Sequence, residues 1–476
     1  MQSADTAGIA QQMRTLLDSQ REAFARQMYP SLEVRLDRLE RLRRMTEQYE
    51  KAIANAISAD FGHRSMHETE MAEILVVLSG IRHARRHLGR WMRPHRVRTP
   101  VHMWPARSEL LPQPLGVAGI IGPWNYPYQT AVLPAVGALA AGNRVMLKPS
   151  EMAPALAEVV RAAVAEFFAP EEFSVVLGDQ QVGRAFSRLP FDHLFFTGST
   201  AVGRQIALAA AENLTPVTLE LGGKSPAILD VNCNLDLAAE RIAVGKLLNA
   251  GQTCVAPDYV LLPAGCVDDF SAAFLLAASK LYPSFAGNPD YTSIVNDRHY
   301  DRLRGLIADA EGKGARLLRA GSGNQRARAG RWIEPTLIVG ATDDMSVMRE
   351  EIFGPLLPVI GYETLDQAVD YVNRRPRPLA LYWFGSDKRR REKVLTATLS
   401  GGVTINDVCW HVAQDNLPFG GVGASGMGAY HGESGFRTFS KMKPIFHQAR
   451  INGFPLFRPP YGRRFEAILG LLKRIA

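Results

Sequence analysis

Gly116-Val-Ala-Gly-Ile-Ile-Gly-Pro-Trp-Asn-Tyr-Pro127 opens the repeat that decides the fold. The apolar run 116–121 is followed by a proline-containing turn, by the Ala- and Leu-rich segment 130–141, and by a second apolar run, 144–148. Strands that alternate with helices in this way are typical of a parallel sheet covered by helices. The sequence therefore predicts an α/β fold built on a doubly wound sheet.

The same alternation continues through most of the chain. Further strands are expected over residues 173–177, 191–196, 216–220, 259–262, 332–339, 356–360, 379–384 and 402–407, and further helices over 153–168, 201–212, 235–248, 268–281 and 297–311. A chain of 476 residues is too long for one simple core. We therefore expect two doubly wound, Rossmann-like domains in succession.

The flanking segments have a different character. The first ninety or so residues predict helices: Ser31 is placed to cap one, and Met71, Ile74, Leu75, Leu78 and Ile81 have the spacing of one buried face. Prolines between 94 and 114 exclude a helix there, so segments 101–104 and 109–111 are expected to pair as a hairpin around 105–108. Near the end, residues 443–451 read as a strand, and Phe465, Ile468, Leu469, Leu472 and Ile475 predict an amphipathic helix.

The bulk composition excludes several classes of protein. Hydrophobic residues make up 46% and charged residues 21%, as in ordinary globular proteins, and four cysteines are too few for a disulfide framework. The start resembles no signal peptide, no apolar run is long enough to span a membrane, and no cluster suggests a metal. We expect a cytoplasmic protein without a metal site.

The net charge of +8 includes an arginine-rich stretch. Its members are Arg82, Arg85, Arg86, Arg90, Arg93, Arg96 and Arg98. A nucleic-acid patch would account for them, but no nucleic-acid-binding motif accompanies them. We favour a solvated helix face that runs into a linker, and we expect no nucleic-acid partner.

Cys254, in Gly251-Gln-Thr-Cys-Val-Ala-Pro257, is the candidate for covalent chemistry. A lone cysteine is more often a buried packing residue than a nucleophile. Glu220, at the end of an apolar strand, reads either as a surface acid or as a carboxylate made basic by partial burial. Together with the Asn125 side-chain amide, these residues supply the thiol, base and donor that covalent chemistry on a carbonyl requires.

A second group of residues follows the predicted strands, at the edge where doubly wound sheets bind ligands. Lys148 and Glu151 follow one strand, and Gly198, Ser199 and Gly203 open the helix after another. The usual glycine-rich dinucleotide fingerprint is absent, yet a helix N-terminus offers free N–H groups to a pyrophosphate. A dinucleotide site here makes hydride transfer the natural companion of the thiol chemistry.

Taken in order, the motifs resemble those of the aldehyde dehydrogenase superfamily over nearly the whole chain. They are Pro123-Trp-Asn-Tyr-Pro127, Lys148-Pro-Ser-Glu151, Phe196-Thr-Gly-Ser-Thr200, Leu219-Glu-Leu-Gly-Gly-Lys224, Gly251-Gln-Thr-Cys254 and Glu351-Ile-Phe-Gly-Pro355. The residues after Cys254 and the glycine-dense segment 419–432 are similar to the class 3 branch, and within it to bacterial coniferyl aldehyde dehydrogenases.

The resemblance implies roles for the matched residues. It implies that Cys254 is the nucleophile, that Glu220 is the general base and that Asn125 belongs to the oxyanion hole. The cofactor-binding residues that it implies are Trp124, Lys148, Glu151, Gly198, Ser199, Gly203, Leu221, Glu351 and Phe353. Among them, Lys148 and Glu151 would bind the adenine-side ribose, and Glu351 and Phe353 the nicotinamide ribose.

The expected activity is oxidation of an aldehyde, aromatic or medium-chain, to the carboxylic acid by way of a thioester that Glu220 helps to hydrolyse. NAD is the expected cofactor, with NADP tolerated. A thiol esterase without redox chemistry and a catalytically inert protein are the alternatives. Tyr126 and Trp410 would line the substrate tunnel, and the C-terminal helix would lie near its mouth.

The resemblance also implies a domain organisation and a homodimer. The NAD(P)-binding domain would comprise residues 1–94 and 113–222, the catalytic domain 223–435, the β oligomerisation arm 95–112 and 436–455, and the C-terminal tail 456–476.

Overall fold

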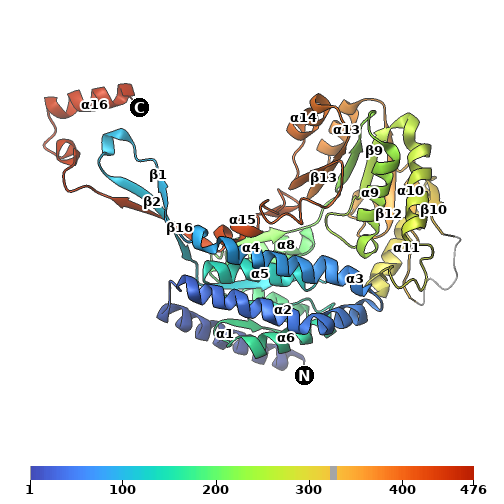
Figure 1. Cartoon of the computed structure of the whole chain (residues 1–476), viewed down its shortest axis with the longest axis horizontal. Helices are drawn as coiled ribbons and strands as arrows, with labels where there is room; N and C mark the ends of the chain where they lie inside the picture. Colours follow the sequence, from blue (N-terminus) through green and yellow to red (C-terminus); the bar gives the residue numbers. More distant parts are fainter. Residues whose placement is uncertain (1, 322–329, 476) are drawn as a thin grey trace.

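The computed structural model describes residues 2–321 and 330–475, and its strands form three sheets (Figure 1). A six-stranded sheet has the order β15-β7-β6-β3-β4-β5, parallel except for the edge strand β15. Its strands are β3 (Val117–Ile121), β4 (Arg144–Lys148), β5 (Phe173–Val175), β6 (His193–Thr197), β7 (Val217–Glu220) and β15 (Gly426–Met427). The α/β expectation is confirmed.

Helices cover both faces of this sheet, as the alternation of side chains along β3 shows. Ala118 and Ile120 belong to the core formed with α2, α4, α5 and α6, whereas Val117 and Ile121 face α1, α7 and α8. Successive residues of a strand point to opposite faces, so a strand buried on both faces reads as a continuous apolar run. The helices are α1 (Gln2–Arg26), α2 (Leu32–Phe61), α4 (Leu75–Trp91), α5 (Gln129–Ala141), α6 (Pro154–Phe167), α7 (Gln180–Ser187) and α8 (Thr200–Ala211).

A seven-stranded sheet with the order β10-β11-β12-β9-β8-β13-β14 forms the second α/β unit, on the right of Figure 1. Its strands are β8 (Pro226–Leu229), β9 (Tyr259–Pro263), β10 (Arg316–Arg319), β11 (Thr336–Val339), β12 (Leu356–Tyr362), β13 (Ala380–Phe384) and β14 (Gly402–Ile405). The flanking helices are α9 (Leu235–Leu247), α10 (Val267–Leu281), α11 (Asp297–Gly312), α12 (Ser346–Arg349), α13 (Leu365–Asn373) and α14 (Lys388–Ala397). The sequence did not predict α7, α13, α14, β8 or β10. Of the ten residues of α14 only Val394 is buried, so the helix has no apolar period to detect.

The N-terminal helices confirm one local prediction and correct another. Ser31 caps α2, its hydroxyl accepting a hydrogen bond from the Val34 amide. The buried face predicted for the following helix was wrong in part, because Met71 and Leu75 are exposed while Ile74 and Ile81 are buried. A π-helical turn, Glu70–Ile74, lies between α3 (Met66–Thr69) and α4. Its wider winding changes which side chains face the core.

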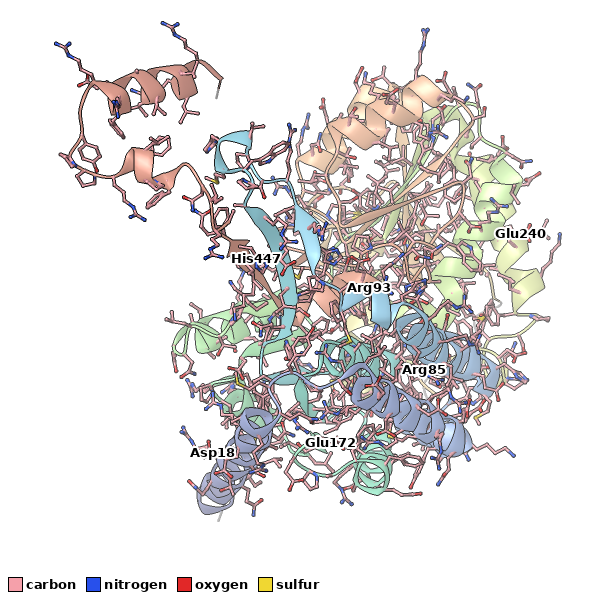
Figure 2. All side chains as sticks on the ribbon, turned by 60° about the vertical axis from the view of Figure 1, so that its left-hand side comes forward. Asp18, Arg85, Arg93, Glu172, Glu240 and His447 are labelled. Carbon is pink, nitrogen blue, oxygen red and sulfur yellow. The ribbon has the colours of Figure 1, made fainter. Side chains whose placement is uncertain are left out.

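The third sheet is an arm that projects from the molecule (Figure 1), formed by β1 (His95–Val97), β2 (Arg107–Pro114) and β16 (Ser440–His447). The predicted hairpin was wrong in register. β1 pairs with β2 through His95 and Leu110, and residues 101–103 form a 3-10 turn. β16 begins and ends earlier than the predicted strand 443–451 and pairs along the whole of β2. Figure 2 shows His447 at the arm and Arg93 where the chain leaves α4 for it.

The C-terminal helix α16 (Arg463–Ile475) forms as predicted, although the side chain of Ile475 lies outside the described residues. Its expected position near the substrate mouth is not found within one chain. It lies beyond the tip of the arm, on the opposite side of the molecule from β9, the strand that follows Cys254 (Figure 1). In the part of the chain that the structure describes, no helix has the length and apolar character to cross a bilayer.

Candidate active site

Cys254 lies in a tightly bonded loop between α9 and β9. Asn249 and Ala250 adopt the left-handed conformation, with φ of 52° and 49°, which turns the chain sharply at the end of α9. The Gln252 side chain fixes the turn by donating to the carbonyls of Asn249 and Ser293, at 3.0 and 3.1 Å. Cys254 itself is only half-buried. The loop thus holds Cys254 in place and leaves part of the residue exposed.

Asn125 lies against the same loop. Its side-chain amide nitrogen donates to the Gln252 carbonyl at 3.1 Å, and the Asn249 side chain donates to the Asn125 carbonyl at 2.9 Å. An amide nitrogen carries two hydrogens, so one N–H of Asn125 remains for a substrate oxygen. The predicted donor and the predicted nucleophile are therefore brought together, although about 130 residues of sequence separate them.

Glu220 ends β7 and is 2% exposed. Among the described residues, neither of its carboxylate oxygens has a hydrogen-bond partner. Burial raises the pKa of Glu220 well above the usual range of a carboxyl. Burial also raises the pKa of the Cys254 thiol, and the nearby charges of Glu351 and Glu220 add to this rise. A carboxylate with a raised pKa and a thiol with a raised pKa thus lie in one site that is partly shielded from water.

Glu351 reaches this site because Gly222 has no side chain. A Cβ on Gly222 would lie 1.9 Å from a carboxylate oxygen of Glu351. Burial raises the pKa of Glu351 to about 8, and its Oε1 has no hydrogen-bond partner in the described residues. Phe353, in the left-handed conformation with φ of 51°, packs edge-on to Trp124 with 5.4 Å between ring centroids. Both predicted aromatic residues therefore lie together near Glu351.

The remaining predicted cofactor residues lie at the carboxyl edge of the six-stranded sheet. The Lys148 ammonium, 2% exposed, pairs with the exposed Glu151 carboxylate at 2.6 Å. Ser199 caps α8, its hydroxyl accepting from the Val202 amide. A Cβ on Gly203 would lie 2.6 Å from Leu221, so glycine permits α8 to pack closely on that residue. Gly198 lies in the turn between β6 and α8.

These features fit a bound dinucleotide. A helix N-terminus suits the pyrophosphate, an exposed carboxylate beside a lysine suits a ribose diol, and the orphaned Oε1 of buried Glu351 suits a second hydroxyl donor. In the residues that the structure describes, no group of His, Cys, Asp and Glu is arranged to hold a metal ion.

The sequence did not single out several residues that build the site. Asn249 and Gln252, both fully buried, hold the Cys254 loop, and Asp258 accepts from the Ile352 amide at 2.9 Å. Lys246 is buried, and burial lowers its pKa to about 8. The motif around Cys254 contains Gln252, and Asn249 lies two residues before that motif, but partners of both come from distant segments.

The two residues expected to line a tunnel have different environments. Tyr126 is buried and hydrogen-bonds Thr253 at 3.0 Å. Trp410 is 66% exposed. Tyr126 is therefore part of the packed wall behind the Cys254 loop, and Trp410 lies at the surface.

Comparisons with known proteins agree with this geometry. Residues 5–445 match the model of the Aldehyde dehydrogenase family. A probable coniferyl aldehyde dehydrogenase of Pseudomonas aeruginosa is 50% identical over 96% of this chain and 95% of that protein. The dimeric NADP-preferring aldehyde dehydrogenase of Canis lupus familiaris is 39% identical over 91% of this chain and 94% of that protein.

The fold is also found among solved structures. A structure of Staphylococcus aureus AldH in a substrate-bound state superposes with a TM-score of 0.91 at 38% identity, over 96% of this chain and 99% of that one. The chain therefore belongs to the aldehyde dehydrogenase family and is an NAD(P)-dependent enzyme that oxidises aldehydes to carboxylic acids.

Proposed function

We propose that Cys254 is the nucleophile, Asn125 an oxyanion donor and Glu220 the general base of this oxidation, with an aromatic aldehyde such as coniferyl aldehyde as substrate. The observation that carries the proposal is Glu220, a carboxylate 2% exposed whose two oxygens find no hydrogen-bond partner in the described part of the chain, beside a half-buried thiol. The 50% identity to a probable coniferyl aldehyde dehydrogenase supports the substrate class.

The side chains can perform each step of acyl formation and release. The Cys254 thiolate attacks the carbonyl carbon, forming the C–S bond as the C=O π bond breaks, and the Asn125 side-chain amide donates to the oxyanion that forms. A bound NAD(P), held by Glu351, Phe353 and the Lys148–Glu151 pair, would supply the hydride acceptor that conversion of this adduct to the thioester requires. Glu220 then removes a proton from water, which attacks the thioester and releases the acid and the thiolate.

We also propose that NAD is preferred over NADP. Glu151, beside Lys148, would accept hydrogen bonds from a ribose diol and repel a 2′-phosphate. The canine relative is an NADP-preferring enzyme, which supports tolerance of the second cofactor. An esterase without redox chemistry would leave Glu351 and the Lys148–Glu151 pair without a role.

We infer further that the chain forms a homodimer through the arm, residues 95–112 and 436–455, and resides in the cytoplasm. An isolated three-stranded arm buries little apolar surface, and four free cysteines suit a reducing compartment. The remaining chain would divide into an NAD(P)-binding domain, 1–94 and 113–222, a catalytic domain, 223–435, and a tail, 456–476.

The experiment that tests this function follows the absorbance of the reduced cofactor with a panel of aldehydes. We expect a higher kcat/KM for coniferyl aldehyde and cinnamaldehyde than for acetaldehyde. Equal kcat/KM values across the panel would exclude an aromatic preference. Ester hydrolysis without cofactor reduction would instead favour the esterase.

A further inference from the structure

A cluster of buried charges lies behind the Asn125 loop, outside the residues given a role above. Arg64, Glu68 and Glu73 are 1%, 7% and 0% exposed. Moving such groups out of water costs free energy that their mutual attraction often fails to recover. A cluster of this kind contributes little to the free energy of unfolding. Its contacts to the loop that carries Asn125 indicate that it holds that loop in place.

One end of the cluster holds the backbone of Asn125. The Arg64 guanidinium donates through Nη1 to Glu73 Oε1 at 2.9 Å and to the Asn125 carbonyl at 3.1 Å. The Asn249 side chain donates to the same carbonyl. Two donors from distant segments thus fix the peptide plane from which the Asn125 side chain projects.

The other end holds the start of α5, directly after the same loop. Glu73 Oε2 accepts the amides of Tyr128 and Gln129, at 2.9 and 2.8 Å. The residue at the N-cap of α5, Tyr128, makes no capping bond with its own side chain. Glu73, from the π-helical turn Glu70–Ile74, therefore caps α5 and neutralises the positive end of its dipole.

Arg64 also packs against the aromatic ring of Tyr126, the residue that follows Asn125. Its guanidinium carbon lies 4.7 Å from the centroid of the Tyr126 ring, and the Tyr126 hydroxyl bonds Thr253, the neighbour of Cys254. Arg64 Nε is 3.8 Å from Glu68 Oε1, too long for a hydrogen bond, so Glu73 is the closer carboxylate partner.

We propose that Arg64 and Glu73 are positioning residues that aim the Asn125 amide at the oxyanion formed on the Cys254 adduct. This inference rests on the role proposed for Asn125. It assigns to the N-terminal helical segment a contribution to the chemical step, made through the backbone of the loop rather than by contact with substrate.

The first test replaces Arg64 by lysine, which keeps the charge but loses the planar fork that reaches both Glu73 and the Asn125 carbonyl. Because a displacement of about 1 Å costs about 100-fold in rate, we expect the acylation burst and ester hydrolysis of R64K to slow by roughly 10- to 100-fold. The KM for NAD should stay within about twofold, since Arg64 lies behind the loop and not at the proposed nucleotide residues.

The matched control is Arg38→Lys. Arg38 is also 1% exposed and hydrogen-bonds Glu172 at 3.1 Å, but in the described residues it has no bond to the Asn125 loop. Glu172 lies among the N-terminal helices in Figure 2. A comparable loss of thermal stability in both variants, with slow acylation only in R64K, separates positioning from general destabilisation.

A double-mutant cycle tests whether Arg64 acts on acylation through Asn125. Asn125→Ala alone should slow acylation by about 100-fold or more, and adding Arg64→Lys should slow it no further. A normal burst in R64K, or an equal further loss in the Asn125→Ala background, would overturn the positioning role alone. Unchanged acylation in Asn125→Ala would remove the proposed role of Asn125, and the positioning inference with it. The same cycle with Glu73→Gln in place of Arg64→Lys tests the positioning role of Glu73.

Discussion

The loop that carries Cys254 and the projecting arm are stabilised in opposite ways. In the loop, Asn249 and Gln252 are fully buried and side-chain hydrogen bonds from several segments hold an irregular backbone. In the arm, regular strands pair along their length, yet Phe446 is 49% and Trp104 63% exposed. The hydrogen bonds that hold the loop come from this chain itself, whereas the arm exposes large apolar side chains. The difference teaches that the proposed chemistry depends on a tertiary hydrogen-bond network, and the proposed dimer on exposed apolar surface.

The largest effect expected from this comparison is on the loop side, at Cys254. Cys254→Ala should abolish both aldehyde oxidation and ester hydrolysis, because the acyl-enzyme proposed on this thiol cannot form, and the neighbouring Cys409 Sγ contacts the Val255 carbonyl at 3.7 Å instead. Steady-state assays of both activities measure this, and unchanged NAD binding shows that the fold is intact. Residual turnover through an acyl-enzyme would contradict the assignment.

Glu220→Gln should separate acylation from hydrolysis. The glutamine keeps the shape but cannot accept a proton, so the variant should release about one equivalent of reduced cofactor per site and then stall. In the unmodified enzyme, burial raises the pKa of Glu220, so the ionised base is lost as pH falls through that raised value. Deacylation should therefore rise with pH in the unmodified enzyme and stay low in the variant.

The measurement is rapid-mixing kinetics across pH. If Glu220 also deprotonates Cys254, the burst itself will be slow and will rise with pH, as a larger fraction of the thiol ionises without the base. Near-normal steady-state turnover of Glu220→Gln would leave the reaction without this base.

On the arm side, Phe446→Glu should weaken the proposed dimer. Burial of a large apolar side chain is worth about 2 kcal/mol, so we expect the dissociation constant to rise by roughly 10- to 100-fold. Sedimentation or light scattering at several concentrations measures it. The matched control is Leu208→Glu, on α8, where an apolar side chain is 72% exposed but does not belong to the arm. Equal effects of both substitutions on the dissociation constant would show that the arm is not the dimer interface.

The smallest expected effect is at Glu151, which is exposed and outside the buried network. Glu151→Gln removes the charge that would repel a 2′-phosphate, so the ratio of kcat/KM for NADP to that for NAD should rise by about 10-fold. Kinetics with both cofactors provide the ratio. If this ratio equals that of the unmodified enzyme, residues other than Glu151 determine the preference for NAD over NADP.

Local sequence patterns were informative where local physics decides the structure. The strand Arg144–Lys148 was predicted to the residue, because its three central residues form the apolar run expected of a strand buried on both faces. The cap at Ser31 was predicted because it depends on one hydrogen bond between residues only three positions apart. Where a tertiary partner decides, the pattern failed: the register of β1 on β2 is set by ladder pairing. The exposure of Met71 follows from a π-helical turn.

By itself, the sequence determined the α/β class and, through its ordered motifs, which residues could serve as thiol, base, donor and cofactor contacts. Only the tertiary structure decided how they are held. Arg64, Glu73 and Asn125 come from separate segments and carry no shared pattern, yet they form one buried network. Likewise, the raised pKa of Glu220 arises because the fold removes its carboxylate from water, and no described residue donates a hydrogen bond to it. Residue type and local spacing are written in the chain, but burial and long-range contact exist only once the chain has folded.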